Sequence, residues 1–176
     1  LCGLDILKSV LFKLDPDVSF LDDCFSDGDY IKSNTKILGI KGKGLALLEG
    51  ERVALNILQR LCGIATLTKQ YVEKADPVQI LDTRKTTPGL RSFEKYAVSC
   101  GGGKNHRFGL YDAVLIKDNH IKASGGIMQA VNKVKERHNS SIQIEVETTT
   151  LAEVREAIEA KSDIIMLDNM SIGNIK

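Results

Sequence analysis

Beyond residue 77 the sequence alternates between short apolar runs and helical stretches, and this alternation limits the possible folds more than any other feature. The apolar runs cover residues 78–81, 113–116, 142–146 and 164–167, and helical periodicity covers 126–137 and 151–160. Strands that alternate with helices form a parallel sheet with right-handed crossovers. Residues 76–176 therefore predict the first half of an α/β barrel, with about four of the roughly eight βα units of a complete barrel.

Charged side chains follow each of the four predicted strands. The first strand leads into Arg84 and Lys85, the second into Lys117, the third into Glu147 and the fourth into Asp168. From Lys85 onward these positions are 32, 30 and 21 residues apart, and each interval is long enough for one βα unit. Barrels of this class carry their catalytic residues at the carboxyl ends of the strands. Two cations followed by two carboxylates thus indicate a functional cluster, with ordinary polar loops as the alternative.

Residues 1–75 have a different organisation, in which two predicted helices enclose short strand-like pieces and turns. Apolar side chains recur at helical spacing over 1–14 and again over 51–75. Gly63 is expected to weaken or break the second helix. Gly42 and Gly44 are interpreted as a plain turn between strands, because no complete nucleotide-binding glycine pattern surrounds them. Residues 1–75 therefore predict a small α+β domain with linking helices, and residue 76 begins the second domain.

The distribution of charge narrows the class of ligand. Residues 51–122 carry 12 basic and 7 acidic side chains, whereas the segments on either side each have a net charge of −2. Nucleic-acid binding usually needs a larger basic excess with interleaved aromatic side chains, and aromatic residues make up only 5% here. A small anionic ligand fits better. No apolar run approaches the ~18 residues of a membrane span, and no secretory signal opens the chain, so we expect a cytoplasmic protein.

The cysteines predict neither a zinc site nor a disulfide framework. Cys2, Cys24, Cys62 and Cys100 have no pair at CxxC spacing, and no histidine-rich motif accompanies them. They are interpreted as small buried apolar residues in a reducing compartment.

Two cation-rich loops are candidates for binding an anion. Residues 82–91 contain Arg84, Lys85 and Arg91 together with three threonines, and residues 101–107 place three glycines before Lys104, His106 and Arg107. Guanidinium groups match carboxylates with two parallel hydrogen bonds, and glycine lets the backbone approach a ligand closely. Solvated loops are the alternative in both cases.

The later strand ends leave several roles open. Lys117 leaves a predicted strand where it would be partly desolvated, so it needs an anionic partner. Asp118, its neighbour in the sequence, is the simplest structural candidate for that partner. Glu147 and Asp168 could act as general acid and base, as metal ligands or as acceptors for the hydroxyls of a ribose, and the sequence does not separate these roles.

Taken together, several runs resemble the quinolinate phosphoribosyltransferases, the carboxylating nicotinate-nucleotide pyrophosphorylases. They are LDTRKTTPGLR at 81–91, EKYAVSCGGGKNHR at 94–107, LIKDNHI at 115–121, IEVE at 144–147, LDN at 167–169 and ERVALN with LQR and GIA across 51–65. The resemblance implies an open-faced α/β sandwich domain followed by an α/β barrel, both partial here. It implies that phosphoribosyl passes from 5-phosphoribosyl-1-pyrophosphate (PRPP) to quinolinate with decarboxylation, in NAD biosynthesis. Nicotinate mononucleotide, CO2 and pyrophosphate are the products.

The resemblance also implies roles for individual residues. The substrate-binding set, which holds the two carboxylates of quinolinate, is Arg60, Thr83, Arg84, His106 and Arg107. Lys117 serves there as well, and Lys85 and Lys117 lie near the reacting centre and the pyrophosphate. Glu147 and Asp168 hold the ribose hydroxyls and stabilise the positive charge of the ribosyl transition state. The catalytic set is therefore Lys85, Lys117, Glu147 and Asp168.

The partners implied by the resemblance are Mg²⁺, which accompanies PRPP, and a second copy of the chain. In the family Arg60 reaches into the site of the partner subunit, so we expect a homodimer or a higher oligomer. No direct metal ligand is predicted.

Two other readings stay open at this stage. The family barrel continues beyond Lys176 with glycine-rich loops for the 5-phosphate, so the chain could be a truncated, catalytically silent member that binds a ligand or a partner subunit. It could also be a related phosphoribosyltransferase with a different acceptor, although three cations at Arg84, Arg107 and Lys117 favour a dicarboxylate. Neither a nucleic acid nor a membrane is expected as a partner.

Overall fold

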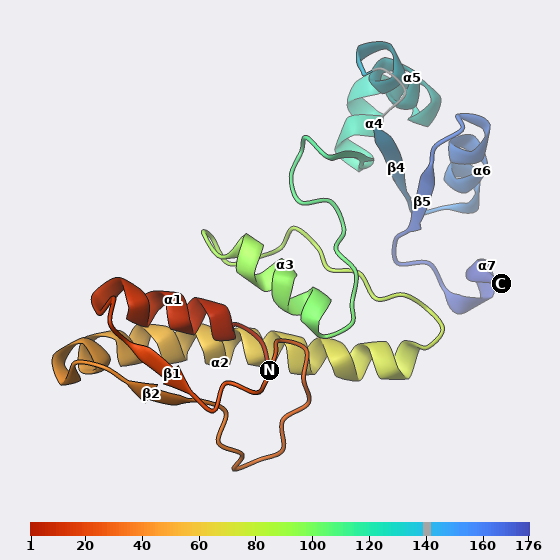
Figure 1. Cartoon of the computed structure of the whole chain (residues 1–176). Helices are drawn as coiled ribbons and strands as arrows, with labels where there is room; N and C mark the ends of the chain where they lie inside the picture. The colour runs from red at the N-terminus through yellow and green to blue at the C-terminus, as the bar shows by residue number, and fades with distance from the viewer. Residues whose placement is uncertain (139–141) are drawn as a thin grey trace. The chain divides into compact units, whose positions relative to one another are not determined.

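The computed structural model describes residues 1–138 and 142–176 (Figure 1). The chain divides into two compact units, Leu1–His106 (unit 1) and Arg107–Lys176 (unit 2). Unit 1 contains α1 (Leu4–Leu14), β1 (Ser19–Leu21), β2 (Gly39–Lys41), α2 (Gly44–Ala75) and α3 (Arg91–Cys100). Unit 2 contains β3 (Ala113–Ile116), α4 (Asp118–Ser124), α5 (Ile127–Arg137), β4 (Gln143–Thr148), α6 (Leu151–Glu159), β5 (Ile164–Leu167) and α7 (Ile172–Ile175).

Helix α1 confirms the prediction for the start of the chain. Its apolar side chains fall on one face, and Leu4, Leu7 and Leu11 are buried. This face packs against α2, beside which α1 runs in Figure 1. The two helices approach closely at Gly50, where a Cβ atom would lie 2.7 Å from Leu11 Cδ2. A larger residue at this crossing would therefore force the side chains of Leu11 and Leu14 to shift.

Helix α2 is longer than predicted and unbroken. It has 32 residues and begins at Gly44 rather than near residue 51. It also continues through Gly63, so the expected interruption there is wrong. A glycine inside a helix costs only about 1 kcal/mol relative to alanine, and the buried face continues past it through Leu61, Ala65 and Thr68. Tertiary packing outweighs the local preference of one residue.

The glycines at 42 and 44 join a strand to a helix, not two strands. Strands β1 and β2 pair antiparallel, with Phe20 opposite Ile40, and Gly44 opens α2. The turn is held by Asp15, whose carboxylate accepts from the Lys43 backbone N–H at 2.8 Å. This bond and the Lys43 side chain lower the pKa of Asp15. The prediction of a turn is confirmed, but its placement between two strands is wrong.

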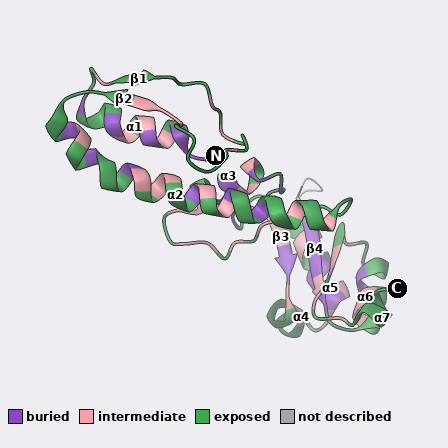
Figure 2. Cartoon of the chain, turned by 90° about the horizontal axis from the view of Figure 1, so that it is seen from below, coloured by how far each residue is buried: buried purple, intermediate pink, exposed green. Residues whose placement is uncertain are grey.

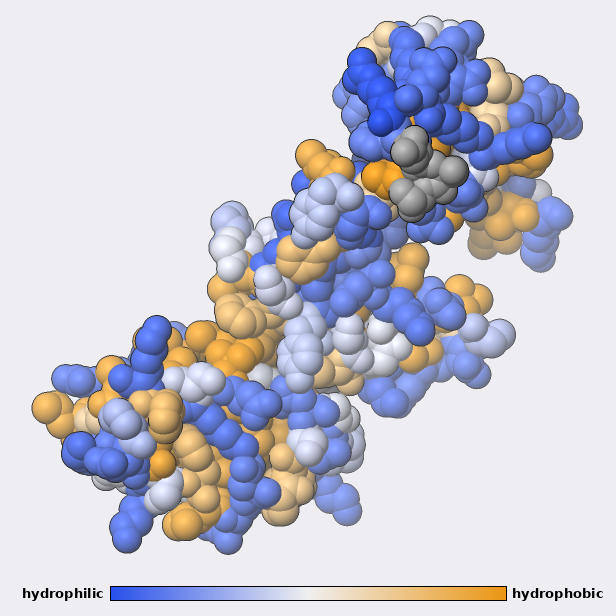
Figure 3. Space-filling view, turned by 45° about the horizontal axis from the view of Figure 1, so that its top comes forward, coloured by the Kyte–Doolittle hydropathy of each residue, from blue (hydrophilic) through white to orange (hydrophobic). Residues whose placement is uncertain are grey.

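Unit 1 exposes apolar surface beside these elements. Figure 3 shows hydrophobic side chains on the outside of the part built from α1, α2 and the β1–β2 pair. Leu45 and Leu48 are 71% and 73% exposed. A groove of about 300 Å³ lies there, lined by Leu7, Leu11, Ile40, Leu47, Leu48, Glu51, Ala54 and Leu55.

The predicted strand at 78–81 does not form. Only Leu81 pairs, in a single parallel bridge with Lys104. The bridge is closed by Lys104 N–H donating to Ile80 O (2.8 Å) and Asp82 N–H donating to Lys104 O (3.1 Å). The apolar run is therefore extended, but its neighbour is a loop that offers one residue for pairing. A strand needs a longer partner than this loop provides.

Unit 2 confirms the alternation that the sequence predicts. Its sheet is parallel with the order β3-β4-β5, and Ile116 lies opposite Val146. Buried residues gather between this sheet and its helices (Figure 2). That core comprises Ile116, Ile127, Ala130, Val131, Ile144, Val146, Ala157 and Ala160. Strands β3 and β5 have the predicted bounds, and Gly126 precedes α5 as expected. The structure is mixed α/β with small open sheets, and closure into a barrel stays a prediction, as does a domain boundary at residues 75 and 76.

Within residues 1–138 and 142–176, none of the helices combines the length and the apolar character needed to cross a membrane.

Candidate active site

The candidate residues fall on both units. Unit 1 carries Arg60, Thr83, Arg84, Lys85 and His106, and unit 2 carries Arg107, Lys117, Glu147 and Asp168. The two sets are described separately because each belongs to its own compact unit.

In unit 1, Arg60 on α2 is held by Glu94 on α3. Arg60 Nε donates to Glu94 Oε1 at 2.8 Å, and Nη2 donates to the same oxygen and to the Thr87 hydroxyl. The Thr87 backbone N–H donates to the other carboxylate oxygen, Glu94 Oε2, at 3.0 Å. Glu94 is 8% exposed. One buried carboxylate therefore fixes both the guanidinium and the loop that carries the predicted anion-binding residues.

The same contacts lower the pKa of Glu94. Burial alone would raise this pKa, but hydrogen bonds from Arg60 and Thr87 outweigh burial and bring it below the ordinary value of 4.5. In the pH range just below 4.5, the unfolded chain binds more protons than the folded chain. The carboxylate therefore contributes stability above this range, and the contribution is lost as the pH falls through the folded-state pKa.

Glu94→Gln should consequently make the free energy of unfolding depend less on pH at acid pH. We expect the free energy of unfolding of the wild-type chain to fall more steeply between about pH 5 and about pH 3 than that of the variant, because only the wild type loses this contribution. Urea denaturation across this range measures the difference. Glu49→Gln, at an exposed position on α2, is the matched control and should keep the wild-type slope. Equal slopes for Glu94→Gln and the wild type would contradict the assignment.

A second buried network joins the loops at 82–87 and 104–106. Lys95 Nζ lies 2.5 Å from Asp82 Oδ1, with the two side chains only 2% and 7% exposed. The ammonium also donates to His106 O (2.9 Å), and His106 N–H donates to Asp82 Oδ1 (2.9 Å). When the side-chain amide of Asn105 is oriented so that both its nitrogen and its oxygen form hydrogen bonds, the nitrogen donates to Asp82 Oδ2 at 2.7 Å. The backbone of His106 is thereby fixed next to the loop that contains Arg84.

The loop that begins at Asp82 lines a small pocket together with α2 and α3. It has a volume of about 280 Å³ and is lined by Arg60, Ile64, Asp82, Thr83, Lys85, Thr86, Glu94, Lys95 and Val98. Arg84 lies in the same loop, and its carbonyl oxygen accepts from Thr86 N–H at 3.0 Å. Across the described part of the chain, Arg84 Nε is the buried side-chain nitrogen or oxygen that lacks a hydrogen-bond partner. A buried donor without an acceptor is costly unless a ligand supplies one, so an anion that reached Arg84 Nε would satisfy it.

In unit 2, the ends of adjacent strands bring Lys117 and Glu147 together. Because Ile116 lies opposite Val146, the next residue on each strand reaches the same edge of the sheet. Lys117 Nζ lies 3.2 Å from Glu147 Oε2, and the lysine side chain is 44% exposed. Asp118 instead pairs with Lys122 at 3.4 Å, and the Asn119 backbone N–H lowers its pKa. Lys117 does have an anionic partner, but the suggestion that Asp118 supplies it is wrong.

Asp168 lies at the corresponding end of β5. Thr148 is opposite Leu167, and Asp168 N–H donates to Thr148 O at 2.8 Å. Asp168 Oδ2 accepts from Asn169 Nδ2 at 3.2 Å. Arg107, at the start of the unit, donates from Nη1 to Ala113 O at 3.2 Å. Three successive strand ends therefore place one cation and two carboxylates along one edge of this sheet.

The sequence pattern does not single out Glu94 and Lys95, although both organise the pocket of unit 1. Their signal is weak because charges within a helical stretch normally face solvent. The burial of both side chains is visible only once α3 is packed against its neighbours.

Comparison with known families identifies the chain. A model described as the N-terminal domain of quinolinate phosphoribosyl transferase matches residues 1–62, and a model of the C-terminal domain matches residues 64–176. The chain belongs to the quinolinate phosphoribosyl transferase family. Arg60 falls in the N-terminal family domain and the other candidate residues fall in the C-terminal one.

Named relatives agree with this membership in the quinolinate phosphoribosyl transferase family. The chain is 50% identical over 170 residues to a probable nicotinate-nucleotide pyrophosphorylase [carboxylating] of Bacillus subtilis, covering 95% of the chain and 58% of the relative. It is 44% identical over 179 residues to quinolinate phosphoribosyltransferase [decarboxylating] 1b of Nicotiana tabacum, covering 97% and 51%. The chain thus spans between half and three fifths of the length of these relatives.

Solved structures of the family have the same fold. The crystal structure of NadC from Streptococcus pyogenes matches with a TM-score of 0.96 and 48% identity, over 99% of this chain and 62% of that one. The nicotinate-nucleotide pyrophosphorylase from Francisella tularensis matches with a TM-score of 0.92 and 46% identity, over 97% and 61%.

Proposed function

We propose that this chain takes part in the transfer of phosphoribosyl from PRPP to quinolinate, with loss of CO2 and pyrophosphate to give nicotinate mononucleotide. The observation that carries the proposal is the buried, unpartnered Nε of Arg84, in the loop whose neighbouring residue Lys85 lines the pocket. Membership in the quinolinate phosphoribosyl transferase family supports it.

The residues of unit 1 suit a rigid dicarboxylate. Quinolinate carries two carboxylates on adjacent ring carbons, and its charge calls for guanidinium and ammonium donors. Arg84 offers a desolvated donor, and Lys85 contributes a positive charge to the pocket lining. Glu94 and Thr87 orient Arg60 through hydrogen bonds from Nε and Nη2, and Nη1 takes no part in these bonds. We propose that this donor set binds quinolinate, together with His106 and Arg107 as the family resemblance implies.

The residues of unit 2 suit the ribosyl part of the reaction. Departure of pyrophosphate leaves positive charge on C1 of the ribose, and fixed carboxylates stabilise such charge. Glu147 and Asp168 supply them, and the Lys117 ammonium keeps Glu147 in position. The pyridine nitrogen then bonds to C1 as the C1–oxygen bond breaks. Loss of CO2 from the adjacent carbon leaves an electron pair on the ring, which takes a proton from solvent. Positioning and electrostatics are what the chain supplies.

Mg²⁺ is proposed to enter with PRPP. Among the described residues, Glu147 and Asp168 belong to no group of three clustered metal-binding side chains. Mg²⁺ is commonly held by one or two carboxylates together with substrate phosphates. The pyrophosphate oxygens are therefore its main ligands in this proposal, with Glu147 or Asp168 as carboxylate donors.

A homodimer in which Arg60 enters the site of a partner subunit is also proposed from the family resemblance. In the single chain Glu94 holds the Arg60 guanidinium at the pocket of its own subunit. In the proposed dimer, the Arg60 that completes the quinolinate donor set of one subunit would come from the other subunit. The cytoplasmic location remains a prediction from the sequence.

Calorimetric titration of the purified chain tests the proposed substrate. We expect saturable binding of quinolinate and at least tenfold weaker binding of nicotinate, which has one carboxylate fewer. Arg84→Met should weaken quinolinate binding roughly 10- to 100-fold, because a charge-assisted hydrogen bond contributes about 1.5–3 kcal/mol. Circular dichroism confirms folding.

The control for this titration is Arg137→Met, which removes an exposed arginine from α5 and should leave binding unchanged. A folded wild-type chain that fails to bind quinolinate, or binds nicotinate equally well, would contradict the proposal. A loss caused equally by both arginine variants would show that only net charge matters.

A further inference from the structure

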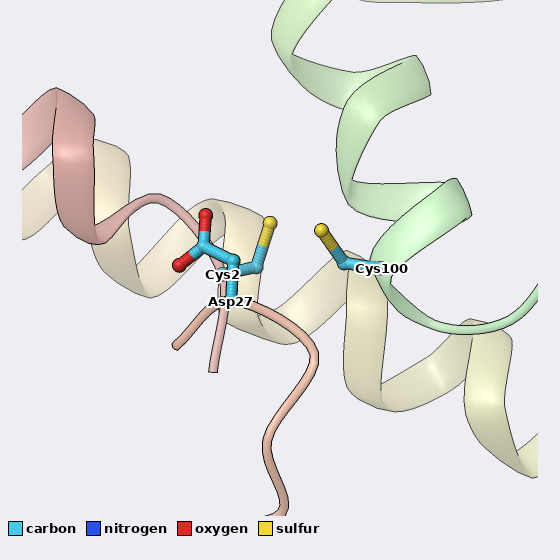
Figure 4. A group of neighbouring side chains, drawn as sticks. All are labelled: Cys2, Asp27 and Cys100. Carbon is cyan, nitrogen blue, oxygen red and sulfur yellow. The ribbon is translucent and has the colours of Figure 1, made fainter. Parts of the chain in front are cut away.

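Three of the four cysteines meet in unit 1, away from the pocket described above. Cys2 precedes α1, Cys62 lies in α2 and Cys100 is the last residue of α3. Asp27, from the segment between β1 and β2, joins them. The sulfur atoms of Cys2 and Cys100 and a carboxylate oxygen of Asp27 all lie within 4.8 Å of one another. Figure 4 shows the two thiols pointing toward each other with the carboxylate beside Cys2.

We propose that Cys2, Cys100 and Asp27 bind Zn²⁺, with the Cys62 thiol as the fourth ligand. Thiolate sulfur selects zinc over hard cations, and structural zinc sites are tetrahedral with sulfur, nitrogen or carboxylate oxygen donors. In such a site zinc lies ~2.3 Å from sulfur and ~2.1 Å from oxygen, which separates neighbouring ligand atoms by roughly 3.5–3.8 Å. The three donors need to contract by about 1.3 Å at most to meet this spacing.

Cys62 lies beside this set but is not one of the three donors that lie within 4.8 Å of one another. Its sulfur accepts from the Cys2 backbone N–H at 3.3 Å and donates to Cys2 O at 3.4 Å. It therefore lies against the backbone of another proposed ligand, and its thiol would have to give up these two contacts and turn toward the metal. Zn²⁺ with three thiolates and one carboxylate is a closed structural site rather than a catalytic one, because no coordination position is left for a substrate.

The carboxylate of Asp27 is oriented by groups around it. Oδ2 accepts from Gly3 N–H at 2.8 Å and from the Tyr96 hydroxyl at 2.9 Å, and Oδ1 accepts from Leu4 N–H at 3.1 Å. A carboxylate offers about four acceptor positions, so these three bonds leave one for a cation. Such supporting hydrogen bonds fix metal ligands in place. Cys2 is itself fully buried, so little side-chain freedom would be lost on binding.

Sequence spacing gives no sign of this site because the four donors come from four separate segments. Their convergence depends on the packing of α1, α2 and α3. Binding needs no oxidant, since each thiol releases a proton to solvent and the sulfur donates its lone pair to the metal. The site is independent of the proposed transferase function, and it would tie the start of α1 to the end of α3, the helix that carries Glu94 and Lys95.

Metal titration under reducing conditions tests the proposal. The chain is stripped with a chelator, and Zn²⁺ is added in competition with a chromophoric chelator. We expect one equivalent to bind, with affinity that rises with pH as thiol protons are released. Cys2→Ser and Cys100→Ser should each lower the affinity at least 100-fold. Cys24→Ser, which changes the exposed cysteine, is the matched control and should bind like the wild type.

A second measurement keeps the test decisive if a cysteine variant does not fold. Co²⁺ added to the wild-type chain should give the intense visible absorption of a tetrahedral site and a sulfur-to-metal charge-transfer band, and Zn²⁺ should abolish both. Substoichiometric zinc binding, octahedral cobalt spectra without the charge-transfer band, or unchanged affinity in folded Cys2→Ser and Cys100→Ser would overturn the proposal. Quinolinate binding is measured on the same samples, and its presence or absence does not alter these outcomes.

Discussion

Lys95→Met should lower the free energy of unfolding by about 3–5 kcal/mol, because it leaves the Asp82 carboxylate buried without its cation. Asp82 is only 7% exposed and Lys95 only 2%, so water cannot replace the lost partner. The same change removes the donor to His106 O. Chemical denaturation monitored by circular dichroism measures the loss.

The Asp82 and Lys95 pair can be separated from a general packing effect by two further variants. Adding Asp82→Asn to Lys95→Met removes the stranded charge and should recover about half of the lost stability, since losing both charges is much less costly than losing one. Lys69→Met removes an exposed lysine whose partner, Glu73, lies 3.7 Å away, and should cost less than about 1 kcal/mol. A double variant no more stable than Lys95→Met would show that the ion pair is not the cause.

Under the proposed function, Glu147→Gln should reduce the rate of phosphoribosyl transfer by about 10²- to 10³-fold, the effect typical of losing one group that stabilises transition-state charge. The amide keeps the size of the side chain but cannot neutralise a ribosyl cation. It also leaves the Lys117 ammonium without the carboxylate that lies 3.2 Å away. The rate is followed as nicotinate mononucleotide formed from quinolinate and PRPP with Mg²⁺.

The kinetic prediction distinguishes catalysis from binding. The loss should appear in kcat, with a smaller change in the KM for quinolinate, because in the proposed mechanism the carboxylate acts on charge that develops during the reaction. Glu136→Gln, at an exposed position on α5 of the same unit, should retain wild-type rates. A fall confined to KM would assign Glu147 to substrate binding instead.

The sequence predicts those helices and strands whose residue pattern can be recognised without knowing their neighbours in the fold. Strand β3 and strand β5 have the predicted bounds because an apolar run between polar residues suffices to define them. The run at 78–81 is also apolar apart from Gln79 but fails to form a strand, since pairing depends on the length of its neighbour at Lys104. Local pattern indicates an extended segment, and only tertiary structure decides whether it becomes a strand.

The candidate sites show the same division. The sequence predicts that charged side chains lie at the ends of three successive strands of unit 2. Because the strands are parallel, these ends lie along one edge of the sheet. That Lys117 pairs with Glu147 and not with its neighbour Asp118 depends on strand register. Glu94 and Lys95 could not be predicted because a helical charge pattern does not reveal which charges are covered.

Helix α2 has a consequence for how this part of the protein folds and evolves. The two family domains meet near residue 63, in the interior of a helix of 32 residues that is about 48 Å long at ~1.5 Å per residue. Helix formation is cooperative along the chain, so neither family domain can melt its share of α2 without weakening the other's. The two halves of α2 should therefore lose their structure together, and a recombination event at the border of the family domains would cut through a shared helix rather than a linker.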